Sequence, residues 1–154
     1  MKTILTIAAA VLVAGTVNAQ KLNDKDVPKT VSDAFTKKYP GTKAGKWVKE
    51  GADFEVEFEL NKIESSAIFD ATGTFKEVEQ EIQKNELPKG IAEYCTKTFT
   101  GYKFDEAAKI TDNKGKVTYE AEMAKGKEHF DALFDDKGNF IKKSDIEKGE
   151  EKKD

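Results

Sequence analysis

The sequence contains no arginine, one cysteine, one histidine and three prolines in 154 residues. The lack of arginine argues against work centred on phosphate groups, because the planar guanidinium is the usual partner of phosphates and base edges. A net charge of −3 gives no attraction to nucleic acid or to an anionic membrane surface. The single cysteine, Cys95, cannot form an internal disulfide. We therefore expect no nucleic-acid partner and a fold that is stable on its apolar core alone.

Motifs that carry catalysis are also missing. No serine or cysteine can be placed beside the single histidine, His129, and a lone histidine makes no metal site. Three Asp-x-x-Gly segments (residues 70–73, 112–115 and 135–138) lack the alternating oxygen ligands and terminal glutamate of a calcium loop. Aspartates that cap their own turns explain these segments. The sequence thus predicts no enzyme, no metal and no cofactor.

Long apolar runs are confined to the N-terminus. A basic start, Met1-Lys2, precedes an apolar stretch over residues 4–13, and Val17-Asn18-Ala19 fits the small-x-small pattern of a cleavage site. We predict a signal peptide over residues 1–19, cut after Ala19. No second apolar span follows, so we expect a periplasmic or secreted monomer with no membrane insertion after cleavage.

Residues 54–60 alternate apolar and acidic side chains without a break. This period of two is typical of a strand with one buried face. Phe54, Val56, Phe58 and Leu60 form the apolar face, and the opposite face carries Glu55, Glu57 and Glu59. A related strand recurs at residues 117–123, where Glu120 and Glu122 follow Thr118.

The chain repeats itself. A helix is predicted from Val27-Pro28-Lys29 to Tyr39, and a second begins at Leu87-Pro88-Lys89 and ends at Gly101. In the strands, Phe54, Val56, Phe58 and Leu60 align with Val117, Tyr119, Ala121 and Met123. Insertions confined to turns, with core positions in phase, indicate a duplication. Each copy is predicted to contain one helix followed by about four antiparallel strands.

These elements predict an α+β fold, with both helices on one face of an antiparallel sheet and the other face open. We divide the chain into a signal peptide (1–19), a polar lead-in (20–26), a first helix-plus-sheet repeat (27–84), a second repeat (85–146) and a charged tail (147–154).

The leader, the tandem units, the x-Pro-Lys helix starts and the Asp-x-x-Gly-x-Phe turns resemble the PepSY-like family, also described as beta-lactamase-inhibitor-like. That family is common in periplasmic proteins of Bacteroidetes-type bacteria. The resemblance spans about residues 26–146. It implies a concave sheet that grips another protein, with no cofactor and no catalysis.

The candidate binding residues lie on the predicted open face: Glu55, Glu57, Glu59, Glu120 and Glu122, with Trp47 on a short strand nearby. The glutamates could bind a lysine-rich partner or divalent cations, or could form an ordinary solvated strand face. Trp47 could anchor an interface, although core packing is the favoured interpretation. Cys95 falls on the apolar stripe of the second helix and is expected to be a core thiol, the alternative being an intermolecular disulfide.

Two functions remain open from the sequence. The first is an exported, non-enzymatic binding module that inhibits or regulates another periplasmic protein through its open face. The second is a small-ligand or cation carrier that uses the acidic side of the same sheet.

Overall fold

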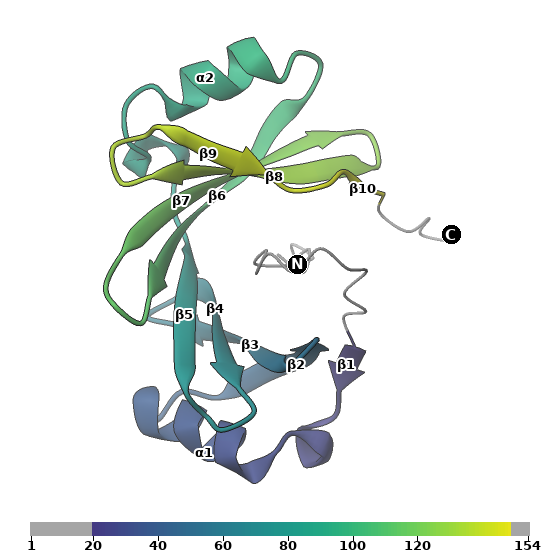
Figure 1. Ribbon diagram of the computed structural model, residues 1–154, viewed down its shortest axis with the longest axis vertical. Coiled ribbons are helices and arrows are strands. Elements are labelled where there is room, and N and C mark those ends of the chain that lie inside the picture. Colours follow the sequence, from purple (N-terminus) through teal and green to yellow (C-terminus); the bar gives the residue numbers. More distant parts are fainter. Residues whose placement is uncertain (1–19, 149–154) are drawn as a thin grey trace.

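The computed structural model describes residues 20–148 (Figure 1). The expected signal peptide and the end of the charged tail lie outside these residues. The first repeat contains α1 (Lys29–Lys38) and the strands β2 (Ala44–Glu50), β3 (Asp53–Leu60), β4 (Ile63–Asp70) and β5 (Phe75–Glu81). The second contains α2 (Ile91–Thr98) and the strands β6 (Lys103–Asp112), β7 (Val117–Lys125), β8 (Glu128–Asp135) and β9 (Phe140–Lys143). Each copy therefore has one helix and four strands, as predicted.

All strands belong to one ten-stranded sheet with the order β1-β2-β3-β4-β5-β6-β7-β8-β10, and β9 also pairs with β8. Every pairing is antiparallel. The repeats join directly through β5 and β6, from Glu77 opposite Asp112 to Glu81 opposite Ala108. The predicted α+β sheet with two tandem units is confirmed.

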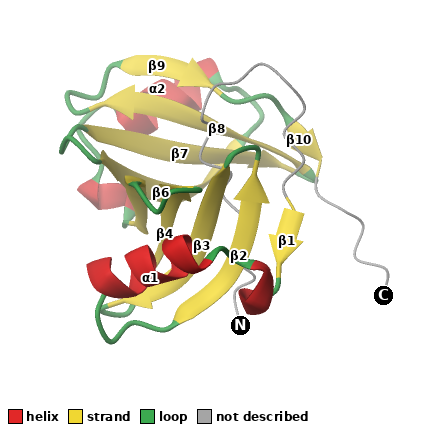
Figure 2. Ribbon diagram, turned by 60° about the horizontal axis from the view of Figure 1, so that its bottom comes forward, coloured by secondary structure: helices red, strands yellow, loops and turns green. Residues whose placement is uncertain are grey.

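The sheet bends strongly, with α1 and α2 on its outer side and an open, concave inner side (Figure 1). Figure 2 shows the same curvature from a second direction, with α1 lying across the strands of its repeat. Register shifts interrupt β2 between Ala44 and Trp47 and β6 between Phe104 and Ala107. Bulges of this kind bend the strand and increase its twist. A Cβ on Gly45 would lie 2.7 Å from the backbone oxygen of Glu57, so the first of these irregularities requires glycine.

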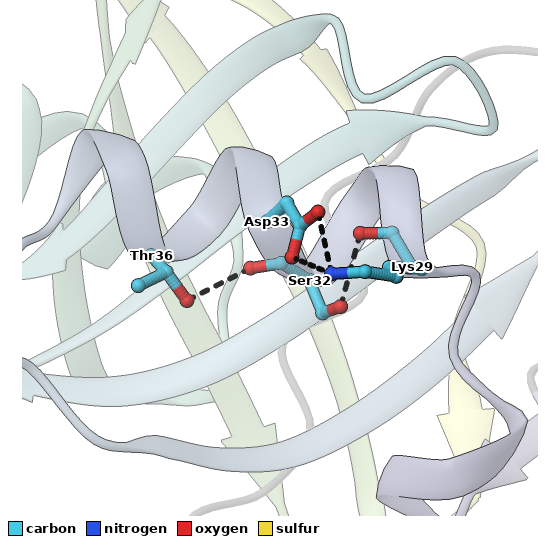
Figure 3. Close-up of polar contacts among 4 residues, drawn as sticks. All are labelled: Lys29, Ser32, Asp33 and Thr36. Atoms are coloured by element: carbon cyan, nitrogen blue, oxygen red, sulfur yellow. Dashed lines mark hydrogen bonds and ion pairs between the residues drawn. The ribbon is translucent and has the colours of Figure 1, made fainter.

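Both helices bury one stripe against the sheet and expose the other. In α1 the buried residues are Val31 and Phe35. The outer side carries local polar contacts, including an ion pair of 2.8 Å between Lys29 Nζ and Asp33 Oδ1 (Figure 3). Thr36 Oγ1 donates a hydrogen bond of 2.9 Å to the backbone oxygen of Ser32. The ion pair supports a solvent-facing helix by a few tenths of a kcal/mol, whereas the threonine bond only satisfies its own hydroxyl.

The second helix begins later than its sequence pattern indicates. The helix α1 starts directly after Pro28, whereas α2 starts at Ile91, three residues after Pro88. Gly90 adopts a left-handed backbone angle (φ 95°) just before α2, which ends the turn that follows Pro88.

Two segments outside the repeats also join the sheet. Gln20–Leu22, in the polar lead-in, forms β1 and pairs with β2. Glu147–Lys148, at the start of the charged tail, forms β10 and pairs with β8. The boundaries assigned from composition therefore cut off both edge strands, because a short polar strand has no apolar period to reveal it.

Each helix covers its own apolar core. The core of the first repeat includes Trp47, which packs edge-to-face on Phe35 with ring centroids 5.9 Å apart. The core of the second repeat includes Cys95 and Met123. The two cores lie on the outer side of a shared sheet, so they do not account for the burial of residues on its inner side.

The thiol of Cys95 is fully buried, as expected from its place on the apolar stripe. Burial raises its pKa to about 11. Because both access and thiolate are lacking, we expect no labelling of the native protein by a thiol-specific disulfide reagent at pH 8, and complete labelling in denaturant. The absorbance of the released thiolate measures this directly. Stoichiometric labelling of the native protein within minutes would show that α2 does not cover the thiol.

Candidate functional site

The inner face of the sheet is built by the alternate residues of each strand. The register places Glu55 of β3 between Val48 of β2 and Ile68 of β4, with Glu57 and Glu59 following on the same face. In the second repeat, Glu120 lies between Ala108 of β6 and Leu133 of β8. The sequence thus placed the predicted glutamates on the correct, helix-free face.

Their exposure differs from that of a solvated strand face. Glu55 and Glu120 are each 2% exposed, and Glu122 is also buried. Glu57 is half-buried, with Oε1 3.1 Å from Lys46 Nζ, and only Glu59 is exposed. The curvature turns most of the acidic row into an interior surface, which the period-two pattern could not indicate.

The register of the two repeats also differs from the sequence alignment. Phe54 lies opposite Phe69, and its counterpart opposite Phe134 is Tyr119, not Val117. Glu55 therefore corresponds to Glu120, which the sequence alignment had matched with Glu57. The alignment was wrong because the extra residues of the second repeat all lie in the hairpin between β6 and β7.

Sequence reasoning missed the residue at the centre of the cluster, Glu79. It lies on β5 between Ser66 of β4 and Ile110 of β6, at the junction of the repeats, and is 4% exposed. Glu77 and Glu81 flank it on the same face. The signal was present, because these three glutamates alternate along β5 as Glu55, Glu57 and Glu59 do along β3.

The second repeat does not reproduce this part of the cluster. Glu77 lies opposite Ile68, whereas the equivalent residue opposite Leu133 is Lys142. Glu79 corresponds in the same way to Ser144, whose amide donates to the backbone oxygen of Asp131. The acidic cluster therefore belongs mainly to β3, β5 and β7.

Burial dominates the electrostatics of the cluster. It raises the pKa of Glu55 to about 7, with a hydrogen bond from Ser66 opposing the shift and the charges of Glu50 and Glu57 adding to it. Burial first, and neighbouring carboxylates second, raise the pKa values of Glu79 and Glu120 well above the ordinary glutamate value. The neighbours of Glu79 come from three further strands: Glu55, Asp131 and Glu122.

Three oxygens of this cluster are buried without a hydrogen-bond partner: Oε2 of Glu55 and both carboxylate oxygens of Glu79. A buried polar atom without a partner costs about 1–3 kcal/mol, and more when it is charged. Unlike an ordinary core, this one contains buried carboxylate oxygens to which no described residue donates.

A pocket of about 300 Å³ lies at these glutamates. Its lining is mainly acidic and includes one cation: Gly45, Lys46, Glu55, Glu57, Phe58, Glu59, Glu64, Ser65, Ser66, Glu79, Glu81 and Glu106. Among residues 20–148, no group of three or more histidine, cysteine, aspartate or glutamate side chains is placed to hold a metal ion. The arrangement suits a cation that brings its own hydrogen-bond donors.

Trp47 does not belong to this surface. It is 3% exposed and lies in the core beneath α1, on the other face of the sheet. Its neighbour Val48 faces the inner side, as required by the alternation along β2. Trp47 therefore cannot anchor a partner on the helix-free face. It packs in the core, which is the interpretation favoured from the sequence.

The three Asp-x-x-Gly segments are turns, as expected. Asp70 Oδ1 accepts hydrogen bonds from the amides of Thr72 and Thr74, at 2.9 and 3.0 Å. Asp112 and Asp135 accept the equivalent pairs in their own turns. These carboxylates are used locally, which explains their lowered pKa values.

Comparisons with known proteins agree with this architecture. The chain resembles a DUF2874 family protein from Bacteroides uniformis (TM-score 0.65, 16% identity, 76% of this chain and 88% of that one). It is also similar to a BLIP-like protein from Bacteroides fragilis (TM-score 0.59, 19% identity, 81% and 89%). A third similar structure, from Bacteroides eggerthii, is described as "putative periplasmic" (TM-score 0.65, 15% identity, 77% and 88%).

No curated protein matches the chain. Across residues 20–148 the structure contains no helix that is long and apolar enough to cross a membrane. A family profile described as "Putative beta-lactamase-inhibitor-like, PepSY-like" matches residues 16–66 and, a second time, residues 52–142. The two matches together cover most of the chain, and on this ground the chain belongs to the PepSY-like, beta-lactamase-inhibitor-like family.

Proposed function

We propose that this protein is an exported, non-enzymatic binding module whose concave sheet face docks onto a positively charged surface of another periplasmic protein. The observation that carries the proposal is the set of buried, unpartnered carboxylate oxygens of Glu55 and Glu79 on the helix-free face. When these carboxyls are ionised, such a face needs a counter-charge, and a cationic partner supplies it. The family's beta-lactamase-inhibitor-like description and the periplasmic description of a similar structure support the same function.

The partner would be held by shape as well as by charge. The curved sheet is fixed by continuous pairing from β1 to β10, so little ordering is needed on binding. The exposed Glu59 and the half-buried Glu57 would steer the encounter, and the more buried glutamates would act once water is excluded. Inhibition or regulation would follow from covering the partner's surface.

The test is a pull-down from periplasmic extract with the mature protein, followed by purification of each captured protein and direct measurement of its affinity. Glu55→Gln, Glu57→Gln and Glu59→Gln combined are expected to weaken binding by about tenfold or more, and high salt to weaken it in wild type. A matched triple of exposed acids elsewhere (Asp33→Asn, Glu93→Gln, Asp136→Asn) changes the net charge equally and should leave the affinity unchanged. Equal effects of the two triples would refute docking through this face.

The pocket favours a second candidate, a carrier of a small cationic ligand. Its volume of about 300 Å³ lies at the lower end of ligand pockets. A thermal-shift screen with small amines and divalent metals distinguishes the two functions, because a ligand that binds only the folded state raises the melting temperature. If no compound shifts the melting temperature at millimolar concentrations, only the protein-docking function remains.

A further inference from the structure

We propose that the pocket beside β3, β4 and β5 binds the primary ammonium group of a lysine side chain that the partner inserts, with Glu79 and Glu55 as its acceptors. This inference rests on the proposed function and specifies which chemical group the concave face recognises. It uses a residue, Glu79, that the period-two row on β3 does not contain.

The lining of the pocket is strongly negative. Seven glutamates and one lysine surround the pocket, and that lysine, Lys46, already lies 3.1 Å from Glu57. No other cation lines the pocket among the described residues. An incoming cation is therefore the natural means of neutralising Glu55 and Glu79 when both are ionised.

The donors of an ammonium group match the unpartnered acceptors of the pocket in number. A lysine ammonium has three N–H donors and no acceptor. The buried oxygens without a partner are Oε2 of Glu55 together with Oε1 and Oε2 of Glu79. Glu55 is also the neighbouring charge that raises the pKa of Glu79 most, which places the two carboxylates in electrostatic contact.

The pocket suits an ammonium group better than a metal ion. Calcium takes six to eight oxygen ligands at about 2.3–2.6 Å, which requires several carboxylates to converge on one point. The described residues contain no such group. The pocket, at about 300 Å³, is instead large enough to take an ammonium group with part of its methylene stem.

Ammonium binding at these carboxyls is linked to the loss of protons. In the absence of ligand, protonation removes the negative charge of the carboxyls whose pKa is raised. A bound ammonium would take the place of that proton. Binding should therefore release protons and strengthen as the pH rises from about 5.5 to 8.5. The charged groups that bear on Glu55 and Glu79 from the surrounding strands are Lys46 and Glu50 of β2, Glu57 of β3, Glu77 of β5, Glu120 and Glu122 of β7 and Asp131 of β8.

The experiment is an NMR titration of the isotopically labelled mature protein with acetyl-Gly-Gly-Lys-Gly-Gly-amide. Peptides with arginine or norleucine at the central position, n-butylamine and calcium chloride are titrated in parallel. We expect the lysine peptide to bind best, with shift changes at β3, β4 and β5 and with tighter binding at pH 8.5 than at pH 5.5. Glu79→Gln should weaken it by about tenfold or more, because it removes the charge and keeps the shape.

The matched control is Glu93→Gln, which removes one negative charge from the exposed side of α2. It should leave the affinity within about twofold of wild type. If Glu79→Gln fails to fold, as judged by circular dichroism, Glu55→Gln provides the same test from β3.

Several outcomes would overturn the inference: the norleucine peptide binding as well as the lysine peptide, arginine or calcium binding more tightly, or equal losses in Glu79→Gln and Glu93→Gln. Butylamine binding as tightly as the peptide would support the ammonium pocket but contradict the docking function. A purified partner that binds Glu79→Gln as tightly as wild type would contradict the pocket alone.

Discussion

The free energy of unfolding is expected to fall as the pH rises from 5 to 8.5. Glu55 has a pKa of about 7 in the folded state, against an ordinary value of 4.5. The folded protein therefore holds more protons than the unfolded chain between these values, and stability is lost as the pH rises through them. The shift corresponds to about 3 kcal/mol for this one carboxyl. Glu79 and Glu120 act in the same direction.

The variant Glu55→Gln isolates the contribution of Glu55 to the pH dependence from those of Glu79 and Glu120. Glutamine resembles the protonated carboxyl, so the variant should match wild type near pH 5 and exceed it near pH 8, with a flatter dependence on pH. The exposed Glu59→Gln should follow the wild-type curve. Urea unfolding at each pH, followed by the fluorescence of the buried Trp47, gives the measurement. A wild-type curve that rises between pH 5 and 8 would contradict the buried carboxyl cluster.

The opposite sign is expected below about pH 4. The turn carboxylates Asp70, Asp112 and Asp135 have lowered pKa values because backbone and side-chain groups of their own turns donate to them. Their contribution is lost as the pH falls through the folded-state values. The two effects together place the maximum stability near pH 5.

The second large effect is expected at Gly73, in the turn between β4 and β5. Its φ of +83° costs an L-residue roughly 1–2 kcal/mol. An added Cβ would also lie 2.6 Å from the backbone oxygen of Thr30 and 3.2 Å from Ala34 Cβ, because α1 sits directly on this turn. Thr30 Oγ1 donates to the backbone oxygen of Ala71 at the same contact. Gly73→Ala should therefore cost about 3 kcal/mol or more.

Two matched glycines separate strain from collision. Gly41 has nearly the same backbone angle (φ +80°) and nothing within 4 Å of an added Cβ, so Gly41→Ala measures the strain alone. Gly138, the counterpart of Gly73 in the second repeat, would bring a Cβ 3.4 Å from the backbone oxygen of Lys89. We expect the loss in unfolding free energy to increase from Gly41→Ala through Gly138→Ala to Gly73→Ala. Equal losses at Gly41 and Gly73 would mean that α1 does not press on the turn.

Local chemistry made much of the fold predictable from the sequence. The unbroken alternation over residues 54–60 identified β3 and both of its faces, and the Asp-x-x-Gly segments identified three turns in which the aspartate accepts the amides. Each of these features is determined by residues that are close together in the chain, so the local sequence pattern is enough to predict it. The same holds for the stripe that buries Phe35 and Cys95.

Features that depend on curvature were not predictable. Glu55 and Glu59 are indistinguishable in the alternating pattern, yet the bend of the sheet buries the first and exposes the second. Glu79 joins them only because β5 pairs with the next repeat. The alignment of the repeats failed for a related reason, since backbone register and not residue similarity decides that Glu120 is the counterpart of Glu55.

The unequal halves of the concave face bear on the orientation of any bound partner. Where the first repeat has Glu77 and Glu79, the second has Lys142 and Ser144 at the corresponding positions. A partner rotated end-for-end would therefore bring its cations to the half of the face that lacks the counterparts of Glu77 and Glu79. The duplication produced two similar halves, but these two differences make the concave face asymmetric. The face can therefore distinguish between the two orientations of a partner.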